Sequence, residues 1–338
     1  MPRRPMPAPS CDRRLDARPR VRARSVYAVW IGVAVVLVHA SQARAQSTSG
    51  PVQQVIAGAG LDIDAALSPD GASIAYASSR DGALEIWMHP LAGGPLFQVT
   101  SSVSNSADRF PVFTPDGKTI VFQSDRADGT RNIWSINLGN RALAQLTDFS
   151  DGAASHPAIS RDGKTICFTH TNTQGDLAIW LMGSDGREQR ELGTGFDCAW
   201  TPDGRIVFAR ARGANEPVRS DILIMDATGQ HAQVISQSTQ RWCRSPAVSP
   251  DGRWVVYTAY SSLFGSDIEE VPGGFQIDPG LRTSLWEVPL AGTSLPAREL
   301  VSATSFNSYA TWSRDGRTLL FTSTRSGSAD VWSIAVRP

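Results

Sequence analysis

Short apolar runs that follow tight-turn signals recur along most of the chain. In one example, the turn phrase at residues 114–117 (TPDG) is followed by the run at residues 119–122 (TIVF), which is rich in β-branched and aromatic side chains. Proline presets φ in such a turn, aspartate can bond its own backbone, and glycine tolerates the closing conformation. Apolar runs of this kind are typical of strands covered on both faces. The pattern predicts repeated β-hairpins.

The turn phrase occurs six times at similar spacing. Its aspartates are Asp70, Asp116, Asp162, Asp203, Asp251 and Asp315, separated by 46, 46, 41, 48 and 64 residues. After each turn come an apolar run, a polar loop and a third run. A period of 40 to 50 residues with several short strands per unit is typical of a propeller blade.

Five of the six third runs end on a tryptophan. These are Trp87, Trp134, Trp180, Trp286 and Trp332. One tryptophan per unit at a fixed offset favours packing between blades over a stacking surface for sugars or bases.

A fourth, outer strand is visible in only five of the six units, at residues 98–100, 145–147, 191–193, 233–235 and 299–301. The sixth unit ends too soon to contain one, but residues 54–56 (QVI) provide the missing copy. The sequence therefore predicts an all-β, six-bladed propeller at residues 51–338, with four-stranded antiparallel blades. The N-terminal strand should complete the last blade and remove its exposed edge.

This six-fold series of turn phrase, polar loop and Ile-Trp run resembles the TolB-like β-propeller repeat, over residues 52–338. The resemblance implies the fold, whereas propellers of this type serve as periplasmic adaptors, as gates on peptidases and occasionally as enzymes. TolB itself carries an α/β domain before its propeller, and the peptidase relatives carry a hydrolase domain with a G-x-S-x-G motif. Neither feature is found in this sequence, so we expect a propeller alone.

The first 45 residues have the composition of an export signal. Arginines precede the apolar residues 26–38, and the small-x-small triplet at residues 43–45 follows. We expect cleavage after Ala45, a short linker at residues 46–50, and a periplasmic or secreted protein. The apolar run is shorter than the ~20 residues of a membrane-spanning helix, so no stable membrane anchor is expected after cleavage.

Loss of this segment changes the charge of the chain. It holds 9 of the 32 Lys and Arg residues and 2 of the 32 Asp and Glu residues, so 23 basic and 30 acidic side chains remain, with a net charge of −7. This balance lacks the basic excess of proteins that bind nucleic acid or anionic membranes. We expect a monomer that binds neither nucleic acid nor anionic membranes.

Candidate binding residues lie six and seven positions before each turn aspartate, or in the case of Trp242 close by, where the innermost strands begin and should surround one mouth of the central channel. The candidates are Asp64, Arg109, Phe110, His156, Phe196, Asp197, Trp242, Arg244 and Tyr309. Such a set suits a protein or peptide partner in the cell envelope, whose carboxylates arginine can bind in a bidentate manner. The alternative is a set of salt bridges within the rim, each of which contributes little.

A cation-dependent enzyme of the lactonase or lyase type is the second hypothesis. Asp62, Asp64 and Asp197 could together hold a hard cation in the mouth. Among the histidines of the mature chain only His156 has the mouth register, and no nucleophile-base pair stands out. We therefore expect a non-catalytic protein and assign no catalytic residue, metal ligand or cofactor.

The 64-residue spacing marks an insertion at residues 260–282 in the fifth unit, on the side of the mouth. Loops this long are usually functional or disordered. Phe264, Phe275 and Ile277 could fold it over the channel as a lid, or it could be plain decoration.

Three cysteines remain after the signal. Cys198 and Cys243 precede successive innermost strands and could form a disulfide in an oxidising compartment, a pairing that the sequence leaves open. Cys167 replaces an apolar residue in a middle strand and is expected to be a buried thiol.

Overall fold

The computed structural model describes residues 50–101, 106–213, 219–237, 241–260, 268–271, 274–291 and 296–336. The predicted signal, its cleavage site and nearly all of the predicted linker lie outside these residues. Every regular element in the described part is a β-strand. Among the described residues, no helix has the length and apolarity that a membrane span requires.

Residues 50–336 form six four-stranded antiparallel sheets, as the repeat predicts. Blade 1 contains β2 (Asp62–Leu67), β3 (Ser73–Ser78), β4 (Glu85–Pro90) and β5 (Phe97–Gln98). Blade 2 contains β6 (Asp108–Phe113), β7 (Thr119–Ser124), β8 (Asn132–Asn137) and β9 (Leu143–Gln145). Blade 3 contains β10 (Gly152–Ile159), β11 (Thr165–Asn172), β12 (Leu177–Gly183) and β13 (Arg190–Thr194).

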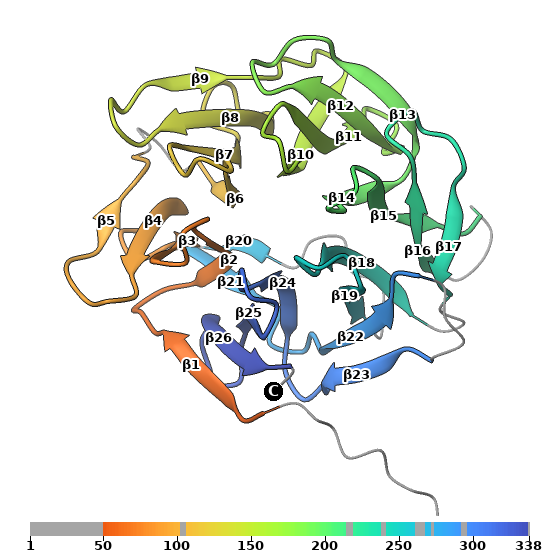
Figure 1. Cartoon of the computed structure of the whole chain (residues 1–338). Helices are drawn as coiled ribbons and strands as arrows, with labels where there is room; N and C mark the ends of the chain where they lie inside the picture. The colour runs from red at the N-terminus through yellow and green to blue at the C-terminus, as the bar shows by residue number, and fades with distance from the viewer. Residues whose placement is uncertain are drawn as a thin grey trace, which may run out of the picture. The chain divides into compact units, whose positions relative to one another are not determined.

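The second half of the ring repeats this order. Blade 4 contains β14 (Phe196–Trp200), β15 (Ile206–Ala211), β16 (Ser220–Met225) and β17 (Gln233–Ser236). Blade 5 contains β18 (Trp242–Val248), β19 (Trp254–Tyr260), β22 (Thr283–Pro289) and β23 (Arg298–Val301), with the inserted hairpin β20 (Ile268–Val271) and β21 (Gly274–Ile277). Blade 6 contains β24 (Asn307–Trp312), β25 (Thr318–Ser323) and β26 (Asp330–Ala335). The six first strands surround the centre (Figure 1).

Strand β1 (Val52–Ile56) closes the ring. It pairs antiparallel with β26, so that Val52 lies opposite Ile334 and Gln54 lies opposite Trp332. The side chain of Ile56 is buried in the core between blades 6 and 1. The outer strand of the last blade therefore comes from the beginning of the propeller, as the count of outer strands predicts.

The turn phrases form hydrogen-bonded hairpins. In the second unit, Gly117 N–H donates to the Thr114 carbonyl (2.8 Å), and the Thr114 hydroxyl and Lys118 N–H both donate to Asp116 (2.6 and 3.1 Å). Gly117 adopts a φ of +70°, which glycine tolerates without a steric penalty. Neighbouring turns also touch, because a methyl group added at Gly163 would lie 3.1 Å from Cδ of Pro115 in the preceding turn. The phrase thus packs one blade against the next.

The tryptophans of the third strands pack within the propeller. Trp286 lies under Arg241, with 4.6 Å between the guanidinium carbon and the ring centroid, and three others lie under the arginine that follows the second strand of their own blade. The guanidinium carbons of Arg80, Arg126 and Arg325 lie 4.7, 5.5 and 5.1 Å from the ring centroids of Trp87, Trp134 and Trp332. In blades 1 and 2 the same arginine also pairs with a buried aspartate at the start of the innermost strand, Asp62 or Asp108. Each of these tryptophans belongs to a hydrophobic cluster.

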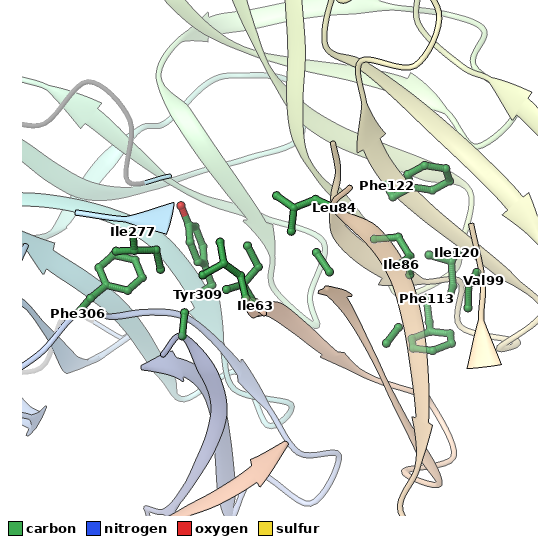
Figure 2. Packing of buried hydrophobic residues seen from close by; sticks show 14 of the residues in the cluster. Ile63, Leu84, Ile86, Val99, Phe113, Ile120, Phe122, Ile277, Phe306 and Tyr309 are labelled. Atoms are coloured by element: carbon green, nitrogen blue, oxygen red, sulfur yellow. The ribbon is translucent and has the colours of Figure 1, made fainter. Parts of the chain in front are cut away.

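The largest cluster joins blades 6, 1 and 2 beside the channel. Ile63 and Tyr309 lie close together in it, and Ile277 of the inserted hairpin packs beside Phe306 (Figure 2). Ile277 is buried, so this end of the insertion contacts the propeller. It is not among the residues that line the channel cavity, and the lid stays a prediction. Phe264 and the side chain of Phe275 lie outside the described residues.

The prediction of a thiol at Cys167 is wrong, and the pairing of Cys198 with Cys243, which the sequence left open, is not the one that forms. Cys167 is not a thiol but forms a disulfide with Cys198, with 6.3 Å between the two Cα atoms, and Cys243 is the buried free cysteine. The sequence suggested a bridge between cysteines near two successive innermost strands. The bridge instead joins the middle strand β11 of blade 3 to the innermost strand β14 of blade 4. Blade stacking brings these two strands together.

Candidate functional site

Each innermost strand contains a β-bulge with one residue in the left-handed conformation. The pairing register shifts at the same point in all six strands. The left-handed residues, which we call the mouth ring, are Asp64, Phe110, His156, Asp197, Ser245 and Tyr309, with φ between 51° and 57°. All six lie six positions before a turn aspartate. Left-handed residues other than glycine are uncommon and cluster at functional sites.

Hydrogen bonds from neighbouring blades help to hold the mouth ring in this conformation. Asp64 N–H donates to the Thr322 hydroxyl (3.1 Å), and Asp197 N–H donates to the Thr169 hydroxyl (2.8 Å). In both cases the threonine belongs to the middle strand of the preceding blade. The conformation of these two ring residues therefore depends on how the neighbouring blades stack.

Asp197 is the most heavily bonded carboxylate of the ring. It accepts hydrogen bonds from Arg244 Nε (2.8 Å), from the Ser245 N–H (3.0 Å) and from the Ser245 hydroxyl (3.2 Å), and His156 Nδ1 lies 3.6 Å away. Burial would raise the pKa of the Asp197 carboxyl, but the charges of Arg244 and His156 outweigh it and hold this pKa below its usual value. Asp197 is therefore ionised in the folded protein.

The opposite side of the ring repeats this pairing. Arg109 Nε and Nη2 lie 2.8 and 3.2 Å from the two carboxylate oxygens of Asp64. Blades 1 and 4 thus contribute the aspartates, and blades 2 and 5 contribute the arginines. Since each arginine binds the aspartate of the preceding blade, salt bridges within the rim, the alternative that the sequence offered, form at both aspartates.

Three ring residues form an aromatic cluster at the mouth. The Phe110 ring lies 3.9 Å from the imidazole of His156 and 5.0 Å from the Tyr309 ring, measured between centroids. Arg109 lies over the Phe110 ring of this cluster, with its guanidinium carbon 4.3 Å from the ring centroid. Blade 5 places the small Ser245 where blade 2 places Phe110, so the two halves of the ring differ at this position.

Two predicted site residues lie away from the ring. Phe196 is buried in the core of blades 4 and 5 and stacks on Trp242, with 5.1 Å between ring centroids and an angle of 10° between the planes. Neither residue is among those that line the channel cavity. Trp242 is half-buried at the start of β18.

Two further residues belong to the site but are not among the sequence candidates. Ser245 is one, although its register is the same as that of Phe110. Arg131 is the other: it directly precedes β8 and remains exposed, and among the described residues it makes no ion pair. Burial of its neighbourhood and the positive charges of Arg109 and Arg244 lower its pKa. Arg131 lies in the loop between the second and third strands, on the mouth side of the blade. This position could have identified it from the sequence.

The predicted cation ligands do not come together. Asp62 pairs with Arg80, Asp64 with Arg109 and Asp197 with Arg244. Within the described ranges, no group of three or more His, Cys, Asp or Glu side chains could hold a metal ion. The carboxylates that the second hypothesis requires are thus each bound by an arginine of the same protein.

A cavity of about 380 Å³ occupies the channel and is lined by all six innermost strands. The mouth ring forms one part of its wall, and residues further along the strands, toward the turns, form the rest. Small ligands bind in concave sites of this size that combine an apolar wall with a few polar groups. The channel therefore offers both a polar mouth and an interior space.

Comparisons with known proteins agree with this architecture. The family model described as the TolB beta propeller domain matches residues 44–216, just over half of the chain. Among solved structures, a candidate TolB from Agrobacterium tumefaciens superimposes with a TM-score of 0.61 and 19% identity, covering 82% of this chain and 91% of that one. A search of curated proteins finds no match.

Two other solved structures show how widely this fold is used. Oligogalacturonate lyase from Vibrio parahaemolyticus has a TM-score of 0.57 and 12% identity, covering 84% of this chain and 93% of that one. TolB from Acinetobacter baumannii has a TM-score of 0.55 and 17% identity, covering 82% of this chain and 63% of that one. At these identities the likeness establishes the fold alone, and the fold is shared by proteins of different function.

Proposed function

The chain belongs to the TolB beta propeller domain family, and we propose that it is a non-catalytic binding protein that takes a protein or peptide partner at the mouth of its channel. The observation that carries this proposal is the mouth ring. Six equivalent strands hold six residues of different chemistry in the same uncommon backbone conformation. Such strain persists only where the surrounding structure enforces it, and it concentrates at binding sites.

The chemistry of the mouth suits a peptide. Phe110, His156 and Tyr309 provide a preorganised aromatic surface, and aromatic residues dominate the binding energy of protein interfaces. Arg131 is exposed at the start of blade 2's third strand and interacts electrostatically with Arg109 and Arg244, so it adds a positive charge suited to an acidic group of the partner. The carboxylates of Asp64 and Asp197 are each bound by arginine, which supports a binding role over a cation-dependent lactonase or lyase.

The location of the partner follows from the first part of the sequence. The basic, apolar and small-x-small segments of residues 1–45 support export, and we propose that the mature protein works in the periplasm or outside the cell, with a partner in the cell envelope.

Replacement of Phe110 by alanine tests the mouth as the binding site. Peptides would be selected from a random displayed library on the unaltered protein, and their affinity measured by fluorescence anisotropy. We expect Phe110→Ala to weaken the selected peptides by roughly 30-fold, the loss of about 2 kcal/mol that a central aromatic residue gives.

The matched control is Phe97→Ala, which makes the same chemical change on the outer strand of blade 1, where Phe97 is 53% exposed. We expect it to leave the affinity unchanged. The proposal fails if no peptide binds saturably, or if the two substitutions weaken binding equally. Metal analysis of the purified protein completes the experiment, because one stoichiometric divalent ion that is lost on Asp64→Ala would favour the enzyme hypothesis instead.

A further inference from the structure

Beyond the mouth ring, the inner wall of the channel consists of small side chains. The position two residues after each ring residue is partly exposed to the channel in all six strands. It is occupied by Ala66, Val112, Ala158, Ala199, Ala247 and Thr311, and all six line the cavity. Larger side chains here would meet on the channel axis and fill it. The cavity therefore exists because these six positions carry small residues.

The wall of this inner space is apolar. Trp200 and Trp312 line it toward the turns, and their indole N–H groups are already bound by the carbonyls of Ala158 (3.2 Å) and Ala247 (3.1 Å). The remaining residues there are alanine, valine, isoleucine, proline, the disulfide-bonded Cys198 and Thr311. Apart from Thr311, polar side chains enter the lining only at the mouth ring. One end of the cavity is thus polar and the rest is apolar.

Both carboxylates of the ring are paired with an arginine of the following blade. Asp64 is bound by Arg109 and Asp197 by Arg244, each at 2.8 Å. A charged ligand would lose its hydration inside the channel without gaining an unpaired counter-charge, which is strongly unfavourable. An uncharged ligand has no such penalty. The site therefore selects against ions.

Ser245 offers a hydrogen-bonding partner at the polar end. Its hydroxyl donates to Asp197 and keeps lone pairs that can accept a bond from a ligand. Phe110, at the corresponding ring position three blades away, presents an aromatic ring instead of a polar group. A ligand with one hydroxyl group would therefore orient that group toward Ser245.

We propose that the inner channel binds an uncharged small molecule with a compact apolar body of one or two rings and a single hydroxyl or similar polar group. The volume supports this size, because a cavity of roughly 150 Å³ holds benzene and this cavity is about 380 Å³. The inference goes beyond the peptide proposed for the mouth and can be tested separately, since the cavity is shaped by residues behind the ring.

Titration of the full-length protein with 2-naphthol, measured by isothermal calorimetry, tests this site. We expect saturable binding of one molecule per chain. Ala199→Leu, which fills the cavity from blade 4, should weaken binding at least tenfold, and Ala66→Leu should do the same from blade 1 on the opposite side. Both variants should unfold at or above the temperature of the unaltered protein, because they fill empty space.

Ala142→Leu is the matched control, since Ala142 is exposed on the rim of blade 2. It should bind 2-naphthol with unchanged affinity. Two results would overturn the proposal: an unaltered protein that shows no saturable binding, or a folded Ala199→Leu or Ala66→Leu variant that binds as tightly as the unaltered protein. Since one filled variant that folds is sufficient, a folding defect in the other does not prevent a decision.

Discussion

Replacement of Val52–Ile56 by an alternating Gly-Ser segment is expected to lower the melting temperature of the protein by roughly 4–20 °C. The change removes the pairing of β1 with β26 and the buried side chain of Ile56, which lies in the core between the last and first blades. Loss of a buried isoleucine alone costs about 2–5 kcal/mol, and 1 kcal/mol corresponds to roughly 2–4 °C in a domain of a few hundred residues or less. The exposed edge of β26 should also promote association between molecules.

The same replacement in β17 (Gln233–Ser236) is the matched control for this experiment. β17 is also an outer strand, but the chain connects it directly to β16 of its own blade, and two of its four residues are exposed and two half-buried. We expect a smaller decrease in melting temperature and no association, as measured by calorimetry and light scattering. Equal losses in the two variants would show that β1 acts only as an ordinary outer strand.

The closure of the ring could be predicted because every blade repeats the same local signals. Turn, apolar run and aromatic residue lie within a few residues of one another, so each blade can be read from its own segment. β1 followed from a count, since six turns were accompanied by only five outer strands downstream of them. The resemblance to the TolB-like repeat predicted the same fold. The features of the fold that depend on local sequence or on a count of repeats were therefore predicted correctly.

The inner geometry of the site could be predicted only in part. The register placed Asp64, Phe110, His156, Asp197 and Tyr309 at the mouth, where the structure has them. It did not separate these positions from the ones immediately before them, because the bulge in each innermost strand breaks the alternation of side chains. Consequently Phe196 was chosen although it is buried, and Ser245 was left out of the candidate residues.

The contacts between blades had no local signal. Arg109 and Arg244 bind carboxylates 45 and 47 residues earlier in the chain, and nothing in the sequence near them indicates that choice. The disulfide of Cys167 and Cys198 was missed for the same reason, since it depends on which strand of one blade faces the next. The apolar cavity could have been predicted, because the register of the turns also aligns its six small residues.

The second large effect is expected from Asp197→Asn, which should lower the free energy of unfolding by about 3–5 kcal/mol at pH 7. The substitution keeps the shape of the side chain but removes its charge, and with it the ion pair in which Arg244 Nε lies 2.8 Å from the carboxylate. It also weakens the acceptor of the Ser245 N–H and hydroxyl. Urea denaturation measures the loss. As control, Asp185→Ala removes an exposed pair with Arg187 and should cost less than about 1 kcal/mol.

The dependence of this difference on pH follows from the direction of the pKa shift. The pKa of Asp197 is lower in the folded protein than the ordinary value of about 3.9, so below that value the unfolded chain binds more protons than the folded one. The stabilisation by the charge is therefore complete above about pH 4 and decreases as the pH falls further. Asp62 and Asp108, whose pKa values are raised by burial, titrate in both proteins and cancel in the comparison. The two proteins should thus converge in stability toward pH 2, and a difference that grows on acidification would contradict the role assigned to the Asp197 charge.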